Sequence, residues 1–84
     1  MDVLKETQSI LNEVLSLNGR ASGFTADTPL LGSIPELDSM AVVAIITTME
    51  ERFGFCVDDD EIDGATFQTL GSLADFVARK VAAV

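Results

Sequence analysis

The sequence predicts an all-α fold, a four-helix bundle with three main helices, one short helix and a long loop after the first helix. Three observations indicate this fold. Apolar residues recur at helical spacing in three segments, residues 2–17, 39–53 and from 72 onward. Glycines and prolines gather between the first two segments. The chain has 84 residues, 48% of them hydrophobic, which suits one domain spanning residues 1–84.

The first predicted helix covers residues 2–17. Its apolar residues are three, four and seven positions apart, so they form one broad stripe along the helix. Asp2 can cap the start of this helix, because its carboxylate can accept a hydrogen bond from a backbone N–H of the first turn. The pair Asn18-Gly19 is suited to end it, since both residues tolerate a left-handed backbone.

Residues 18–38 form the predicted long loop. The segment has few periodic apolar residues and contains five helix-breaking residues, Gly19, Gly23, Pro29, Gly32 and Pro35. A connection of this length inside a small domain is unusual, and it suggests either a function or a loop docked onto the core. We expect four apolar side chains to hold it there, those of Phe24, Leu30, Leu31 and Ile34.

The second predicted helix covers residues 39–53. Asp38 or Ser39 can cap its start, and Gly54 can end it. The run from Met40 to Ile46 is apolar nearly all round, so this helix is either central or leaves an apolar face for a partner. Valine and isoleucine also favour strands, and a buried strand is the main competing prediction. The length of the segment favours a helix.

The last third of the chain predicts one short and one long helix. Glycines interrupt residues 57–71, where one short helical turn fits around Thr66 to Leu70. Ser72 and Asp75 have the spacing of a capping box, so we expect the last helix to begin at Ser72.

The charge balance excludes several classes of partner. The chain has 14 acidic and five basic residues and a formal net charge of −9. Nucleic-acid binding needs a basic surface, which this composition cannot supply. Anionic membrane surfaces are disfavoured for the same reason, and the longest apolar run, Met40 to Ile46, is too short to span a bilayer. The natural complement of this chain is a basic protein partner.

Residues that carry enzymatic or metal chemistry are scarce. Histidine is absent and Cys56 is the single cysteine, which argues against zinc sites, iron–sulfur sites and an internal disulfide. The usual base for a serine or cysteine nucleophile is missing too, so we expect no enzyme and no catalytic residue. Cys56 is expected to be a small core hydrophobe. A single thiol and no secretion signal suit a cytoplasmic protein.

Ser39 is the residue to which the chemistry points. It follows a loop and opens an apolar helix, where backbone N–H groups and the helix dipole favour negative charge. A phosphate-linked group on Ser39 would therefore be well placed. From spacing alone, the simpler interpretation is that Ser39 only caps the helix. If Ser39 carries chemistry, another enzyme must attach it.

The sequence resembles the acyl carrier protein family over nearly its whole length. Four segments carry the resemblance: Asp27-Thr28-Pro29-Leu30, Leu37-Asp38-Ser39-Met40, Met49-Glu50-Glu51-Arg52-Phe53-Gly54, and residues 67–73. In that family the signature is Asp-Ser-Leu, and its serine carries 4'-phosphopantetheine through a phosphodiester. Ser39 is the matching serine, and Met40 replaces the usual leucine.

The resemblance implies a division of labour. A phosphopantetheinyl transferase would attach the cofactor to Ser39, and Asp38 would help to present the serine to that enzyme. Acyl-loading and acyl-transfer enzymes would dock through basic patches, while the protein itself, a monomer in most family members, supplies attachment and recognition. Nine acids and one base between residues 36 and 63 are consistent with such docking. The implied docking residues are Glu36, Ala41, Ala44, Glu50 and Glu51.

Departures from the family pattern indicate a specialised carrier. Ala41 and Ala44 occupy positions that are often polar or acidic in housekeeping fatty-acid carriers, and Arg52 stands where those carriers frequently have an acid. The expected docking face is therefore less acidic and more apolar near Ser39. This pattern favours a specialised carrier over one of general fatty-acid synthesis. The approach to the signature, Gly32-Ser33-Ile34-Pro35-Glu36-Leu37, resembles that of carriers from dedicated acyl, lipid or polysaccharide-related pathways.

Three alternatives stay open at this stage. A peptidyl or aminoacyl carrier uses the same attachment chemistry, and Asp38 is compatible with it. An unmodified acidic protein-interaction module would have the same fold and charge. A calcium loop beginning at Asp59 is the weakest of the three, because its twelfth position, which needs a glutamate, is Leu70.

Overall fold

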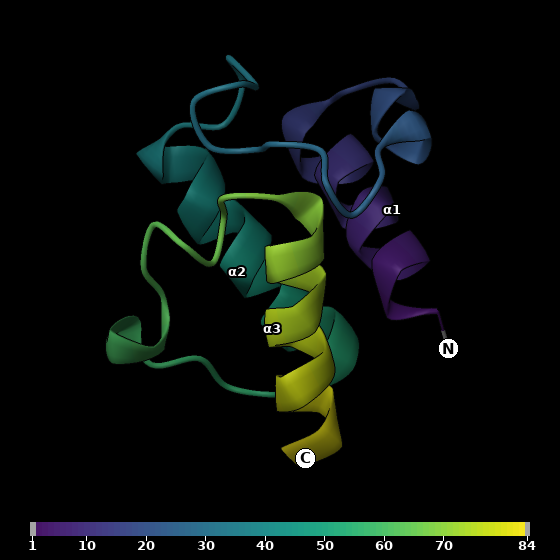
Figure 1. Ribbon diagram of the computed structural model, residues 1–84. Helices are drawn as coiled ribbons and strands as arrows, with labels where there is room; N and C mark the ends of the chain where they lie inside the picture. The colour runs from purple at the N-terminus through teal and green to yellow at the C-terminus, as the bar shows by residue number, and fades with distance from the viewer. Residues whose placement is uncertain (1, 84) are drawn as a thin grey trace.

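Three α-helices joined by two long connections make up the protein (Figure 1). The computed structural model describes residues 2–83. The helices are α1 (Val3–Leu15), α2 (Ser39–Phe53) and α3 (Leu70–Ala83), and two short 3-10 helices, η1 (Arg20–Gly23) and η2 (Asp59–Glu61), lie in the connections. The all-α prediction is confirmed. Helix α1 packs against both α2 and α3 and is the common partner of the bundle.

The hydrophobic core draws on every part of the chain, including both connections. Side chains from α1, α2 and α3 supply most of it. The connection between α1 and α2 adds five buried residues, Leu17, Ala21, Leu30, Ile34 and Leu37. The connection between α2 and α3 adds two, Phe55 and Phe67. The first connection is therefore a packed part of the fold, as its length suggested.

Helix α1 begins as predicted and ends earlier. The Asp2 carboxylate accepts a hydrogen bond from the Lys5 N–H at 3.2 Å, which confirms the expected cap. The prediction that the helix runs to residue 17 is wrong. Ser16 already adopts a left-handed conformation, with φ of 54°, and its N–H bonds to the Asn12 carbonyl. This early turn carries Leu17 into the core, where 1% of its surface is exposed.

Three of the four apolar side chains expected to hold the first connection are partly or fully buried. Leu30 and Ile34 belong to the core, and Phe24 packs against it. The prediction for Leu31 is wrong, because 48% of its surface is exposed. Leu31 lies in a turn, in which the Leu30 carbonyl accepts hydrogen bonds from the Ser33 and Ile34 N–H groups, and the core holds only the Leu30 side chain.

Helix α2 has the predicted bounds, Ser39–Phe53, so the competing strand prediction is wrong. Asp38 adopts an extended conformation before the helix and caps it, and Gly54, with φ of 76°, ends it. Ile45 and Met49 are buried in the core, while the opposite side of the helix is exposed.

The second connection differs from its prediction in two respects. The short helical turn lies at Asp59–Glu61 and not around Thr66 to Leu70, where the chain forms turns and then enters α3. Cys56 is exposed, so its expected place in the core is wrong. The flanking Phe55 is buried and stacks on Phe53, with ring centroids 5.9 Å apart, which leaves Cys56 on the outer side of this stretch.

Helix α3 begins two residues before the predicted start. The capping box is formed by Thr69 and Ser72 and not by Ser72 and Asp75. The Ser72 hydroxyl accepts from the Thr69 N–H at 3.0 Å, and the Thr69 hydroxyl accepts from the Ser72 N–H at 3.1 Å. This reciprocal pair is a capping box in which serine takes the place of the usual glutamate.

A backbone clasp explains the earlier start of α3. Residues 26–31 of the first connection and residues 67–71 share four backbone hydrogen bonds of 2.8 to 3.0 Å. Two of them satisfy the first N–H groups of the helix, because the Leu70 N–H donates to the Thr28 carbonyl and the Gly71 N–H to the Ala26 carbonyl. A side chain at Gly71 would place its Cβ 2.8 Å from the Ala26 carbonyl oxygen, so this approach requires glycine.

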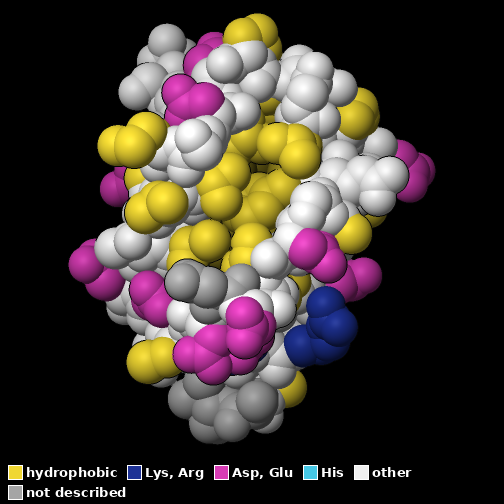
Figure 2. Space-filling view, turned by 90° about the vertical axis from the view of Figure 1, so that its left-hand side faces the viewer, with side chains coloured by type: hydrophobic (Ala, Val, Ile, Leu, Met, Phe, Trp, Pro, Cys, Tyr) yellow, Lys and Arg dark blue, Asp and Glu magenta, His cyan; other side chains and the backbone are white. Residues whose placement is uncertain are grey.

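The surface is acidic around an apolar hollow. Figure 2 shows hydrophobic side chains gathered in the centre of one face, with acidic side chains at several points around them. Among residues 2–83, no helix is long and apolar enough to cross a membrane.

Candidate functional site

Ser39 is the first residue of α2, and its side chain is exposed. The capping role that spacing alone assigned to it belongs to Asp38. The Asp38 carboxylate accepts a hydrogen bond from the Ala41 N–H at 2.8 Å, and the Asp38 carbonyl accepts from the Val42 N–H at 3.0 Å. Because Asp38 satisfies these two N–H groups, the helix does not need the Ser39 hydroxyl.

Two backbone N–H groups at this helix start have no protein acceptor within residues 2–83. They belong to Ser39 and Met40, the first two residues of α2. Both lie at the exposed, partially positive end of the helix, where anionic groups are stabilised. The exposed hydroxyl and the two open N–H groups together fit a phosphodiester on Ser39.

The segment before Ser39 is held on both sides. Leu37 is buried, with 6% of its surface exposed, and Glu36 forms an ion pair with Arg20 of η1. The hydrogen bond to its own backbone N–H, and then the Arg20 guanidinium, hold the pKa of Glu36 below its ordinary value. Leu37 thus ties the backbone to the core directly before the capping residue Asp38, and Glu36 ties it to η1.

The other expected site residues fall into two groups. Met40, Ala44 and Glu51 are exposed on α2, whereas Ala41 is half-buried against the core. Glu50 uses its carboxylate to accept a hydrogen bond from the Val57 N–H at 2.8 Å. The structure therefore places Met40 and Ala44 near Ser39 on an accessible surface. The carboxylates of Glu36 and Glu50, in contrast, have partners within the protein.

Val43 is an exposed residue that the apolar pattern of α2 did not predict. Its side chain is 61% exposed, one turn from Met40, which is 79% exposed. The signal was present in the sequence, since residues three apart on a helix share a face. It was hidden because the run from Met40 to Ile46 is apolar on all sides.

Comparison with known proteins shows the family of this chain. The family described as phosphopantetheine attachment site matches residues 6–77. The chain belongs to the acyl carrier protein family. The solution structure of a holo acyl carrier protein from Nitrosomonas europaea is 56% identical in sequence, covers 98% of this chain and 99% of its own, and superimposes with a TM-score of 0.89. No curated protein sequence matches the chain significantly.

Membership of the acyl carrier family establishes the general activity. The chain is a carrier and not an enzyme, and its cofactor is a covalently attached 4'-phosphopantetheine. As a carrier domain it interacts with a transferase and with acyl-handling enzymes.

Arg52, where housekeeping acyl carriers frequently have an acid, has an internal partner. Its guanidinium donates to the Glu13 carboxylate at 2.7 Å and so links the end of α2 to α1. Both side chains remain exposed, and each charge offsets the other. Arg52 thus links two helices, in addition to reducing the negative charge of α2.

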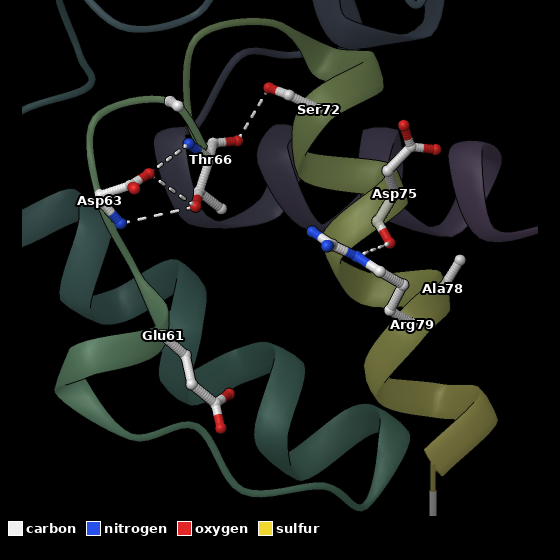
Figure 3. Close-up of a pocket in the computed structure, with 8 residues that line it drawn as sticks. Glu61, Asp63, Thr66, Ser72, Asp75, Ala78 and Arg79 are labelled. Atoms are coloured by element: carbon white, nitrogen blue, oxygen red, sulfur yellow. Dashed lines mark hydrogen bonds between the residues drawn. The ribbon is translucent and has the colours of Figure 1, made fainter.

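A surface pocket of about 710 Å³ lies between the second connection and α3 of this acyl carrier (Figure 3). Arg79 reaches into it from α3, and Glu61, Asp63 and Asp75 are among its lining residues. Asp63 is engaged with the Thr66 N–H and hydroxyl, and Glu61 with Lys80. Ser39 does not line this pocket. Within residues 2–83, no three acidic or cysteine side chains gather closely enough to hold a metal ion.

Proposed function

We propose that Ser39 is the attachment serine of this acyl carrier. The observation that carries the proposal is the open start of α2: an exposed hydroxyl beside two N–H groups without acceptors, with Asp38 capping the helix in its place. An anion at this position is stabilised by the helix dipole by about 0.3–1 kcal/mol. The family signature supports the same residue, since Leu37-Asp38-Ser39-Met40 matches it.

Each residue at the site has a role in the proposal. In the transferase reaction the Ser39 oxygen forms the new P–O bond, the pyrophosphate bond of coenzyme A breaks, and adenosine 3',5'-bisphosphate and the hydroxyl proton leave. The Ser39 and Met40 N–H groups face the negative charge of the resulting phosphodiester. Asp38 keeps the first turn of α2 in place and is presented to the transferase. When attached, the phosphopantetheine supplies a thiol that carries acyl groups as thioesters.

We further propose a specialised carrier of a dedicated acyl, lipid or polysaccharide-related pathway. The proposal rests on the docking face: Met40 and Ala44 are exposed and apolar, Ala41 is half-buried, and Glu51 is an exposed acid. Housekeeping carriers often present acids at positions 41 and 44. Standard fatty-acid elongation enzymes should therefore use the holo protein poorly, and equal use of this protein and their own carrier would contradict the proposal.

The cargo is proposed to be an acyl group. Loading the holo protein with acyl ligases and, in parallel, with aminoacyl ligases tests this assignment, since aminoacyl loading alone would indicate a peptidyl carrier. We also propose that residues 1–84 form a single carrier domain that is monomeric. The exposed free thiol of Cys56 suits a reducing compartment, and we propose the cytoplasm on that ground.

Intact mass spectrometry tests the attachment site. Wild type, Ser39→Ala and Ser33→Ala are incubated with coenzyme A and a broad-range phosphopantetheinyl transferase. Wild type and Ser33→Ala, which removes another exposed serine, should each gain one phosphopantetheine, and Ser39→Ala should gain none. Circular dichroism should show the same helix content in all three. A mass gain in Ser39→Ala, or none in wild type, would contradict the proposal.

A further inference from the structure

The clasp holds the first connection closely against the start of α3. It consists of the four backbone hydrogen bonds between residues 26–31 and residues 67–71. At Gly71 the two backbones are so close that a Cβ would lie 2.8 Å from the Ala26 carbonyl oxygen. All donors and acceptors of the clasp are backbone groups, so it fixes the path of the chain itself. The first connection therefore leaves the clasp from a defined position.

Two turns continue this hydrogen-bonded path from the clasp to α2. The Leu30 carbonyl accepts from the N–H groups of Ser33 and Ile34 at 3.2 and 3.1 Å. The Ile34 carbonyl accepts from the Leu37 N–H at 3.0 Å, and both of these side chains are buried. Asp38, which caps α2, follows directly. Every residue between the clasp and Asp38 thus lies within one of two hydrogen-bonded turns.

This path is the stiffest direct link between the starts of α3 and α2. Helices α2 and α3 both pack on α1, and in Figure 1 the first connection passes the start of α3 and then turns toward α2. The other tie near the site is the ion pair of Arg20 with Glu36, whose side chains are 58% and 38% exposed. An exposed pair of this kind holds its partners only weakly. The clasp therefore has the stronger influence on where the first turn of α2 lies.

We propose that the clasp, with Gly71 at its closest approach, is a positioning element for the modification of Ser39. The inference rests on the proposed attachment at that serine. In the transferase reaction the Ser39 hydroxyl oxygen must meet the phosphorus of coenzyme A in line with the bond that breaks. A displacement of about 1 Å that originates far from the chemistry can slow such a step about a hundredfold. Disturbing the clasp would displace this oxygen without altering any residue beside it.

Two variants disturb the clasp in different ways. Gly71→Ala introduces a methyl group at the close approach. Leu31→Pro removes the N–H that donates to the Phe67 carbonyl at 3.0 Å. Proline is common at the second position of a type II turn, and Gly32, with φ of 84°, has the backbone conformation that the third position requires. Leu31→Pro should therefore fold, and it carries the test if Gly71→Ala does not.

Two control variants separate positioning from stability. Gly64→Ala makes the same substitution at an exposed glycine where a Cβ meets nothing within 4 Å. Val77→Ala leaves a cavity in the core further along α3 and so lowers stability, but it alters no hydrogen bond of the clasp. Urea unfolding ranks the stabilities of the variants. Circular dichroism sets a temperature at which all of them are folded, and the kinetics are measured there.

Transferase kinetics test the proposal with the whole protein, a broad-range transferase and coenzyme A. Gly71→Ala and Leu31→Pro should each lower kcat by about tenfold and change KM by less than about twofold, because orientation is lost while the exposed residues at the site are the same. Val77→Ala and Gly64→Ala should keep kcat within about twofold of wild type. A loss that follows the clasp and not the stability ranking supports positioning.

NMR spectroscopy checks the displacement without the transferase. The amide signals of Ser39 and Met40 should shift in both clasp variants, because the chain that leads into α2 has moved. They should stay at their wild-type positions in Val77→Ala. Unshifted signals in the clasp variants would show that the start of α2 is held independently of the clasp, which contradicts the inference.

Three kinetic outcomes would also overturn this inference. Wild-type kcat in both clasp variants would show that the clasp only stabilises the fold. An equal loss of kcat in Val77→Ala would assign the effect to stability. A change confined to KM would assign the clasp to binding of the transferase and not to orientation of the serine. Failure of wild type to gain mass at Ser39 would instead refute the proposed function, so the two failures are distinguishable.

Discussion

The N-termini of α2 and α3 differ in how their first backbone N–H groups are satisfied. At α3 the first four N–H groups all have protein acceptors: two carbonyls of the first connection, the Thr69 hydroxyl and the Thr69 carbonyl. At α2 the Asp38 side chain and carbonyl accept from the third and fourth N–H groups, and the N–H groups of Ser39 and Met40 have no acceptor within residues 2–83. The closed start fastens the first connection to α3, and the open start offers an anion site.

This difference teaches how one small domain separates stability from function. The α3 start is buried under a chain segment, so its N–H groups must be paired inside the protein. The α2 start is exposed, so water or a bound anion can serve its N–H groups without a stability cost. The first connection contributes to both helix starts, because residues 26–31 bond to the start of α3 and residues 36–38 lead into α2.

Amide hydrogen exchange should give the largest contrast between the two helix starts. The Leu70 and Gly71 amides, bonded at 2.9 and 2.8 Å, should exchange at least about a hundredfold more slowly than those of Ser39 and Met40. NMR measurement at several pH values separates protection from intrinsic exchange rates. Equal protection at both sites would show that the α2 start is also closed in solution.

Substituting Gly71 tests the closed start through stability. In Gly71→Ala, the new Cβ would lie 2.8 Å from the Ala26 carbonyl oxygen and disturb the clasp. We expect a loss of about 1–3 kcal/mol in unfolding free energy, larger than the gain of up to about 1 kcal/mol from helix propensity.

Urea unfolding of Gly71→Ala should be compared with that of Gly64→Ala. A Cβ at Gly64 meets nothing within 4 Å, so this control should change stability by less than about 0.5 kcal/mol. A stable Gly71→Ala protein would mean that the clasp adjusts easily.

Substituting Asp38 tests the open start with a smaller effect. Asp38→Ala should cost about 1 kcal/mol, because the Ala41 N–H loses its acceptor. Asp38→Asn keeps an acceptor oxygen and should retain most of the stability. If the carboxylate also serves transferase recognition, Asp38→Asn will remain folded and yet be modified slowly by the transferase. Thermal unfolding and the rate of mass gain separate the two roles.

The smallest expected effect concerns the ion pair before Ser39. Arg20→Gln should raise the pKa of Glu36 only part of the way to its ordinary value, because the backbone hydrogen bond persists. Since the folded pKa is lowered, the pair stabilises the fold above the unfolded pKa and this contribution is lost as pH falls through the folded pKa. An NMR titration of the Glu36 carboxyl carbon measures the shift, and an unchanged pKa would show that Arg20 does not contribute.

The sequence by itself determined the helices whose signals are local. Asp2 and Asp38 lie next to the residues they cap, and Gly54 directly follows the helix it ends, so caps and apolar periodicity within a few residues were enough. The family signature likewise lies within four consecutive residues, which is why the candidate serine could be identified before its surroundings.

Only the tertiary structure decided the features that depend on distant partners. The first N–H groups of α3 are received by the carbonyls of Ala26 and Thr28. The Thr69–Ser72 capping box marks the same start locally, but no local pattern encodes the pairing with the first connection. The engagement of Glu36 by Arg20 likewise joins residues far apart in the chain. Hydrogen bonds and ion pairs of this kind form only once the chain has folded, and they decided which charges remain free beside Ser39.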